Sequence, residues 1–242
     1  MPQRYCFFLI YANIFDILFV FAWLTCVFKK KAVPLQSQNN FIMLFESNIR
    51  ELLKYLPSYR VRREKQQMRE LLVQKRRIMS SAERQEQSAA ILQQLEQMQC
   101  FRDAKTVLLY YPVNNEVDVL PLFKKYKKEK TLLLPVTHRR GMTVSPYAGN
   151  ENMHRGKFHI PEPTTPAYEG KIDLIIVPAV AFDKKGLRLG RGGGYYDKFL
   201  KKQSHATLVG VGYDFQLVDA VPVEKHDQRV HRIILPSQTI VI

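Results

Sequence analysis

With 242 residues, the chain is long enough to bury a full hydrophobic core in one domain and to leave a further segment over. Its 37 basic and 22 acidic residues give a formal charge of +15, which favours an anionic partner, either a nucleic acid or a phosphorylated or carboxylated small molecule. The three cysteines form neither a disulfide framework nor a metal-ligand pattern, so a reducing compartment is expected.

Residues 1–60 are interpreted as an apolar extension and connector. Residues 5–28 are almost entirely apolar or aromatic and are followed by lysines at 29–31, so they could cross a bilayer with the later residues in the cytoplasm. Asp16 near their middle would cost about 2.5–3.5 kcal/mol on insertion, and no signal-peptide cleavage site is evident. The alternative is an upstream start site, so that these residues are not part of the working protein. Both interpretations stay open, and a cytoplasmic protein is expected, attached to the membrane only if 5–28 is a genuine anchor.

Residues 61–242 are predicted to form one domain. Helices are expected over 65–79 and 82–99, with Ser80 or Ser81 as the N-cap of the second helix. Apolar runs then predict strands at 106–111, 131–136, 172–177, 207–213 and 230–235, with a short basic helix within 117–128. Strands that alternate with helices predict a mostly parallel sheet with helices on both faces, a three-layer, Rossmann-like α/β fold.

The glycine-rich segment 186–197 is the most informative part of the chain. It lies between the predicted strand at 172–177 and a predicted helix, and four glycines within five positions allow backbone N–H groups to approach an anion. Arg188 and Arg191 add forked donors for phosphate. No lysine follows the glycines as in a P-loop, and Tyr195 stands where a dinucleotide fingerprint has its third glycine. We therefore predict a phosphate loop of another kind, with a flexible loop of small residues as the alternative.

Polar residues that follow the predicted strands are further site candidates, because ligands of such sheets bind at the carboxyl ends of the strands. Glu116 follows the first strand, and Asp227 comes after the strand at 207–213. Each is by itself more typical of a helix cap or a surface carboxylate. Beside a phosphate loop, they become candidates for substrate and Mg²⁺ contacts.

The ordered set of motifs resembles the 5-formyltetrahydrofolate cyclo-ligase family, also called methenyltetrahydrofolate synthetases. The resemblance extends over about residues 62–235 and is carried by Lys65-x-x-x-Arg69, 111–118, 160–163, 173–183 and 188–197, then by Gln216 and His226-Asp227. Two positions depart from the pattern, since many relatives have an acidic residue at His231 and a threonine at Pro236. The apolar leader has no counterpart in ordinary members.

The resemblance implies an ATP- and Mg²⁺-dependent ligase of folate one-carbon metabolism. In this family, ATP phosphorylates the formyl oxygen of 5-formyltetrahydrofolate, and the amine at position 10 attacks the activated carbon. The products are 5,10-methenyltetrahydrofolate, ADP and phosphate. Such a reaction needs cations and backbone donors more than it needs acid–base residues.

The resemblance also implies roles for individual residues. ATP contacts are expected from Lys65, Arg69, Arg188, Leu189, Gly190, Arg191, Gly192, Gly193, Gly194, Tyr195 and Tyr196. Substrate contacts are expected from Glu116, which would bind the pterin, and from Arg191, Gly192, Gly193, Gly194 and Tyr195. Asp197 and Asp227 are the expected Mg²⁺ ligands, and no general base is assigned.

Two other functions compete with this interpretation. A sugar-phosphate isomerase on a related α/β scaffold would need a carboxylate base but no ATP contacts, and the pair Lys65 and Arg69 argues against it. A basic nucleic-acid-binding module would interleave aromatic and basic residues on one surface, whereas Tyr195 and Tyr196 are better explained as walls of a folate pocket. We therefore expect a reduced folate as the partner and no nucleic acid.

Overall fold

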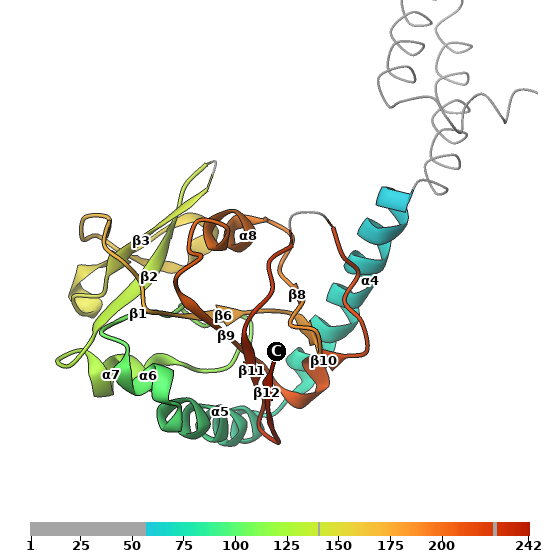
Figure 1. Cartoon of the computed structure of the whole chain (residues 1–242), viewed down its shortest axis with the longest axis horizontal. Coiled ribbons are helices and arrows are strands. Elements are labelled where there is room, and N and C mark those ends of the chain that lie inside the picture. The colour runs from blue at the N-terminus through green and yellow to red at the C-terminus, as the bar shows by residue number, and fades with distance from the viewer. Residues whose placement is uncertain (1–56, 140, 225–226) are drawn as a thin grey trace, which may run out of the picture. The chain divides into compact units, whose positions relative to one another are not determined.

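The structure is a computed structural model that describes residues 57–139, 141–224 and 227–242 (Figure 1). The chain divides into a unit of residues 1–59 and a unit of residues 60–242. The apolar segment 5–28 lies outside the described residues. Among the residues that are described, no helix has the length and apolar character needed to cross a membrane.

A seven-stranded sheet forms the centre of the second unit, in the order β12-β11-β9-β6-β1-β2-β3. Its strands are β1 (Thr106–Leu108), β2 (Thr131–Thr137), β3 (Met142–Pro146), β6 (Leu174–Pro178), β9 (Thr207–Val211), β11 (Arg232–Ile234) and β12 (Thr239–Val241). The five inner strands pair in parallel, whereas β3 and β12 pair antiparallel at the edges. Each edge strand follows its neighbour after a short connection, which can only return the chain antiparallel.

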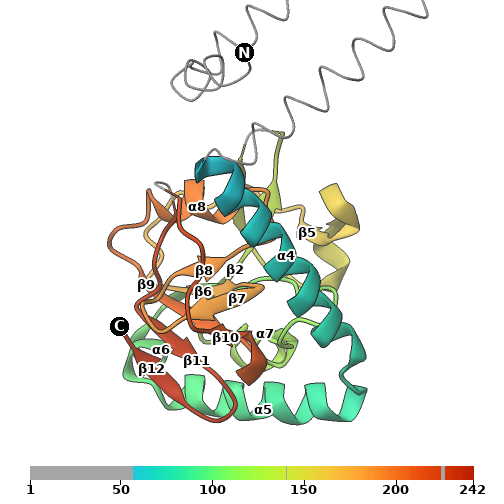
Figure 2. The same ribbon diagram turned by 90° about the vertical axis from the view of Figure 1, so that its right-hand side faces the viewer.

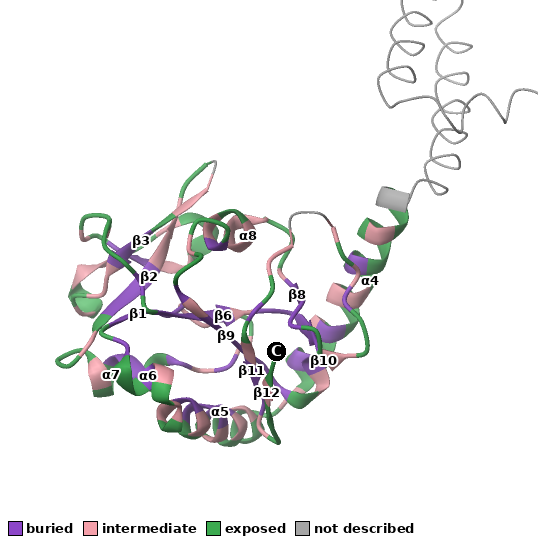
Figure 3. Cartoon of the chain, viewed as in Figure 1, coloured by how far each residue is buried: buried purple, intermediate pink, exposed green. Residues whose placement is uncertain are grey.

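The helices and two buried clusters surround this sheet. The helices are α4 (Pro57–Ile78), α5 (Ser81–Gln97), α6 (Gln99–Asp103), α7 (Leu120–Tyr126) and α8 (Tyr195–Leu200). Side chains alternate across the strands, so Val107 packs in one cluster and Leu108 in the other. Figure 3 shows buried residues, in purple, along the strands of the sheet. α5, α6 and α7 cover the first cluster, and Leu200 of α8 belongs to the second.

Most of the predicted elements are confirmed. The mostly parallel α/β sheet is present, and all five predicted strands form, although β1 and β11 are three residues long. The second predicted helix begins after Ser80, as expected. A capping box holds its start, in which Glu83 N–H donates to Ser80 Oγ at 3.1 Å and Ser80 N–H donates to Glu83 Oε2 at 2.8 Å. That helix ends at Gln97, two residues earlier than predicted, because the chain is extended at Met98 before α6 starts.

One expectation about the glycine-rich segment was wrong, because the segment does not directly follow the central strand. A hairpin of β7 (Ala181–Asp183) and β8 (Arg188–Leu189) intervenes, and with β10 (Leu217–Val218) it forms a separate three-stranded sheet. The Asp183 carboxylate supports the turn by accepting the N–H groups of Lys185 and Leu187, and Gly186 adopts φ 78° there. Strands of two or three residues are too short to show a period in the sequence.

Helix α4 packs against this small sheet. Leu72 of α4 shares a buried cluster with residues of the hairpin and with Val221, which follows β10. Figure 2 shows α4 running past β7, β8 and β10 on the side of the molecule that faces the viewer. α4, the hairpin and the segment after β10 therefore form a second layer of structure, from which the candidate site is built. A two-stranded ribbon of β4 (Met153–Arg155) and β5 (Pro161–Pro163) lies elsewhere in the unit.

Candidate functional site

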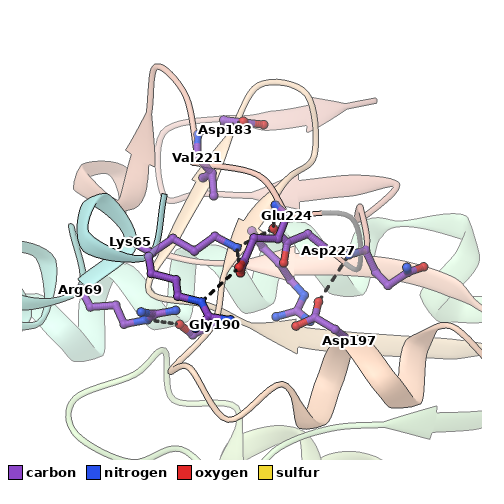
Figure 4. A network of polar contacts seen from close by, with 11 residues as sticks. Lys65, Arg69, Asp183, Gly190, Asp197, Val221, Glu224 and Asp227 are labelled. Carbon is purple, nitrogen blue, oxygen red and sulfur yellow. Dashed lines mark hydrogen bonds and ion pairs between the residues drawn. The ribbon is translucent and has the colours of Figure 1, made fainter. Parts of the chain in front are cut away.

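Lys65 on α4 reaches across to the segment that follows β10. Its side chain is only 6% exposed, and Nζ donates to Asp227 Oδ2 at 2.6 Å and to Glu224 Oε2 at 3.1 Å (Figure 4). Asp227 Oδ2 also accepts the backbone N–H of Glu224 at 2.8 Å. A lysine in so little solvent needs such partners, because an unpaired buried charge is strongly unfavourable.

Arg69 lies one helical turn after Lys65 and contacts the glycine loop. Its Nε donates to the carbonyl oxygen of Gly190 at 2.8 Å. Burial lowers the pKa of the Arg69 guanidinium, and the nearby carboxylates of Glu224 and Asp227 oppose this effect. The four-residue spacing places Lys65 and Arg69 on the same face of the helix, so both cations address the same site.

The glycine loop connects β8 to α8 with its backbone in unusual conformations. Gly192 has φ 99°, and Gly194 has φ 65° at the N-cap of α8. These left-handed values favour glycine over any other residue. A Cβ at Gly192 would lie 3.5 Å from the Arg69 guanidinium carbon, so the loop runs close past that side chain.

Arg188 anchors the base of the loop. Its side chain is 2% exposed, and it donates to Asp197 Oδ1 at 2.8 Å from beneath the ring of Tyr196, whose centroid is 5.6 Å away. Burial lowers the pKa of Arg188, and Asp197 is the first of the charges that raise it. Asp197 Oδ1 also accepts the backbone N–H of Gln228 at 3.4 Å. Since Gln228 directly follows Asp227, the structure brings the two expected Mg²⁺ ligands into one neighbourhood.

These two carboxylates fit a magnesium ion that arrives together with phosphates. In the described part of the chain, no three His, Cys, Asp or Glu side chains are grouped to hold a metal on their own. Asp197 uses Oδ1 for Arg188, and Asp227 uses Oδ2 for Lys65. Proteins commonly hold Mg²⁺ through one or two carboxylates plus waters and substrate phosphates, so two carboxylates are sufficient donors from the protein.

Glu116 joins the turn after β1 to the glycine loop. Its Oε1 accepts from Arg191 at 2.7 Å, and the guanidinium of Arg76 lies 3.8 Å from the same oxygen. Its Oε2 accepts the backbone N–H of Val113 at 3.2 Å. The side chain is 7% exposed. The structure thus places Glu116 in the predicted site, where it is neither a helix cap nor a surface carboxylate.

The two tyrosines of the loop have different surroundings. Tyr195 accepts a hydrogen bond from Lys157 Nζ at 2.9 Å, and its ring meets Phe158 edge to face with centroids 6.1 Å apart. The Tyr196 hydroxyl is buried, and burial together with the charge of Glu116 raises its pKa, so it stays a neutral hydroxyl.

Four buried side-chain polar atoms in the described residues have no hydrogen-bond partner: Arg76 Nε, Arg188 Nε, Tyr196 Oη and Tyr213 Oη. Arg188 and Tyr196 belong to the predicted site, and Arg76 lies beside Glu116. Buried polar groups are nearly always paired, so their concentration here points to a ligand or ordered water.

Other predicted residues do not point into this cluster. Leu189 is buried in the core beneath α4, so it supports the loop from below. His231 lies just before β11, and its Nδ1 accepts the N–H of Leu208 at the start of β9. Pro236 follows β11, where its carbonyl oxygen accepts from Gln94 on α5. Both departures from the family pattern therefore have contacts within the sheet and its covering helix.

Several residues of the cluster escaped the sequence prediction. Arg76 could have been found, because it lies seven residues after Arg69 on the same helical face. Glu224 stands three residues before Asp227, but nothing in the sequence marks it as a partner of a lysine on a distant helix. Phe158 lies in a segment without a periodic pattern and has φ 64°, a conformation that no sequence signal announces.

Comparisons with known proteins identify the family to which the chain belongs. The model of the 5-formyltetrahydrofolate cyclo-ligase family matches residues 61–236. The chain is 31% identical to the 5-formyltetrahydrofolate cyclo-ligase of Mycolicibacterium smegmatis, covering 74% of this chain and 97% of that protein, and 32% identical to the Escherichia coli enzyme, covering 56% and 80%. It is also similar to the NMR structure of Aquifex aeolicus 5,10-methenyltetrahydrofolate synthetase, with a TM-score of 0.67, 34% identity and coverage of 73% and 92%. The chain therefore belongs to the 5-formyltetrahydrofolate cyclo-ligase family.

Proposed function

We infer that the protein is an ATP-dependent 5-formyltetrahydrofolate cyclo-ligase, which converts 5-formyltetrahydrofolate to 5,10-methenyltetrahydrofolate. The activity is assigned to this cluster because its contacts run without a break from one end to the other. Cations of α4, the glycine loop and Glu116 are linked by hydrogen bonds and ion pairs, so a phosphate donor and a pterin can be held side by side.

The nucleotide is proposed to bind at the α4 end of the cluster. Lys65 and Arg69 would contact the phosphates together with the loop from Arg188 to Tyr196. The left-handed glycines support this role, because they expose backbone N–H groups that can donate to phosphate oxygens. Asp197 and Asp227 would hold Mg²⁺, which when bound supplies positive charge to the phosphates in transfer.

The folate is proposed to bind at the Glu116 end. A carboxylate can accept two N–H bonds from the aminopyrimidine part of a pterin, and Glu116 lies beside the guanidinium groups of Arg76 and Arg191. Arg191, Gly192, Gly193, Gly194 and Tyr195 would contact both substrates. Phe158 and Tyr195 are aromatic neighbours of one another and offer apolar surface there.

The chemistry proceeds by activation of the formyl oxygen. This oxygen attacks the γ-phosphorus of ATP, and ADP leaves. The nitrogen at position 10 then attacks the formyl carbon, and the carbon–oxygen bond breaks to release phosphate and the methenyl product. Arg188, Arg191 and Lys65 are positioned to neutralise the charge that spreads over the transferred group. The proton from position 10 passes to solvent in this scheme, since no general base is assigned.

The chain is proposed to divide into a catalytic domain and an N-terminal extension. The catalytic domain is taken as residues 61–242, a three-layer, Rossmann-like arrangement in which the substrates sit near the carboxyl ends of β1 and β6. Residues 1–60 are an extension, and a cytoplasmic location is proposed. Contact between Leu200 and the second buried cluster supports a helix layer on that face.

An absorbance assay tests the function directly. The purified full chain is mixed with 5-formyltetrahydrofolate, ATP and Mg²⁺, and the absorbance of the methenyl product is followed with time. We expect growth that stops when ATP is omitted or when Mg²⁺ is chelated. Absence of growth in the complete mixture would refute the activity. The same preparation should show no salt-dependent binding to nucleic acid, which the competing binding-module interpretation requires.

A further inference from the structure

Arg76 is a buried cation that the proposed reaction does not yet use. It lies near the end of α4 with a side chain 3% exposed, and burial lowers its pKa while Glu116 is the first of the charges that raise it. Its Nε has no hydrogen-bond partner among the described residues. The carbonyl oxygen of Arg76 accepts from Asn115, which is the neighbour of Glu116 in the turn after β1. Both its backbone and its side chain therefore contact this turn.

The spacing along α4 explains why one helix serves both ends of the cluster. Lys65, Arg69, Leu72 and Arg76 follow each other at intervals of four, three and four residues, which places them on one helical face. With a rise of about 1.5 Å per residue, Arg76 lies about 16 Å from Lys65 along the helix axis. Leu72 between them is buried against the hairpin and fixes the helix in place.

Glu116 is shared by two arginines that differ in their freedom to move. Arg191 lies 2.7 Å from Glu116 Oε1, is 40% exposed, and stands between two glycines of the loop. Arg76 lies 3.8 Å from the same oxygen, is almost fully buried, and is held within a helix. Although Arg191 also donates to the carbonyl oxygen of Val113 at 3.1 Å, its exposure gives it more freedom to move away from Glu116 than Arg76 has. Burial and the charge of Glu116 also raise the pKa of Tyr110 and of Tyr196, so both hydroxyls are neutral and cannot replace a cation.

We propose that Arg76 is a positioning residue for the folate. It remains beside Glu116 and holds this carboxylate in place for the pterin N–H groups while Arg191 turns toward the phosphoryl group. This inference rests on the proposed function of the site. Its physical basis is that a buried carboxylate loses much of its stability when its last cation is removed.

Kinetics of three variants test the proposal. Arg76→Leu is expected to raise KM for 5-formyltetrahydrofolate by about tenfold or more, the size of effect seen when a charged hydrogen-bond partner loses its support. KM for ATP should change by less than about twofold, because the ATP contacts lie elsewhere on α4. Arg76→Lys keeps the charge and should recover part of the folate affinity. Arg77→Leu removes an exposed arginine from the same turn and should behave as the wild type.

A double variant distinguishes positioning from packing. In an enzyme that already carries Glu116→Gln, Arg76→Leu should cause no further rise in KM for the folate, because the residue through which it acts is already changed. If Arg76→Leu alone does not fold, the double variant should fold, since it buries no unpaired carboxylate. Equal rises in both KM values, an additive effect in the double variant, or failure of both proteins to fold would each contradict the proposal. A wild-type protein without turnover would instead refute the proposed function.

Discussion

Three cations of the site are already paired with carboxylates that are themselves expected ligands. Lys65 pairs with Asp227, Arg188 with Asp197, and Arg191 with Glu116. The free enzyme therefore holds these charges next to opposite charges, which limits the cost of keeping them in a partly buried site. Binding of Mg²⁺ and ATP would exchange partners, with the cations moving to phosphate and the carboxylates to the metal.

Substitution of Lys65 tests whether this residue contacts ATP. Lys65→Met should raise KM for ATP by about tenfold or more, because it removes a charge-assisted contact and leaves two carboxylates facing the phosphates. KM for 5-formyltetrahydrofolate should stay close to the wild-type value. Lys75→Met, an exposed lysine on the same helix, is the matched control. Steady-state kinetics with each substrate varied in turn provide the measurement, and an unchanged KM for ATP would remove Lys65 from the ATP site.

Substitution of Asp197 tests whether this residue is a ligand of Mg²⁺. Asp197→Asn should raise the Mg²⁺ concentration needed for half-maximal turnover, because an amide is a weaker ligand for this ion than a carboxylate. It also weakens the ion pair with Arg188, for which a loss of roughly 1–3 kcal/mol in unfolding free energy is expected. Titration of turnover with Mg²⁺ and thermal unfolding measure the two effects. Asp219→Asn changes an exposed carboxylate and should alter neither. An Asp197→Asn enzyme with the wild-type Mg²⁺ requirement would place the metal elsewhere.

At the scale of elements, the start of α5 offers a test of stability without a change in activity. Ser80→Ala removes the Oγ that accepts the N–H of Glu83, and loss of such a cap costs about 1 kcal/mol. For a domain of this size, that corresponds to a fall in Tm of about 2–4 °C. The kcat and both KM values should not change, because α5 contributes no residue to the site described. Ser81→Ala, one residue into the helix, should leave Tm almost unaffected, and an equal fall in both variants would show that the capping box is not the cause.

The elements that the sequence could predict are those with a long or regular pattern. α4 and α5 have helical periods over many residues, and the apolar runs of β6 and β9 mark buried strands. The hairpin of β7 and β8 could not be predicted, since its strands are short and its partner β10 lies far along the chain. The same limit applies to Glu224, which becomes part of the site only because the chain returns to α4 after β10. Arg76 is an intermediate case, because its helical spacing is visible in the sequence but its carboxylate partner is not.

At the scale of the whole molecule, the formal charge of +15 suits substrates that carry phosphates and carboxylates. The basic runs at 60–63 and 124–128 are mostly exposed, as expected for solvated helix faces, although Arg62 of the first run lies 3.7 Å from Glu224 Oε1 at the edge of the site. The positive charges proposed to contact the phosphates belong instead to a few side chains, of which Lys65 and Arg188 are buried. Net charge therefore predicts the class of partner, while burial distinguishes most of the proposed binding residues from the exposed basic runs.

The role of residues 5–28 can be decided by fractionation of the native protein. If they form an anchor, activity should sediment with membranes and require detergent for release. If translation starts later, the protein should be found in the soluble extract with an N-terminus near residues 40–60. Determination of that N-terminus by mass spectrometry separates the two cases, and a full-length N-terminus in the soluble extract would contradict both.

A fragment of residues 57–242 should carry the complete activity. All contacts described for the site lie within this range, residues 60–242 form one compact unit, and the family model matches residues 61–236. The fragment begins at Pro57 so that α4 keeps its first turn and Lys65 stays well inside the helix. We expect kcat and both KM values to agree with those of the full chain, and the two proteins to unfold at the same Tm. Because α4 supplies Lys65, Arg69 and Arg76, a second fragment that starts after Ile78 should lose all activity even if it remains folded. If the fragment from residue 57 were folded but inactive, a residue before Pro57 would have to contact the substrates, and the boundary of the catalytic domain would move toward the N-terminus.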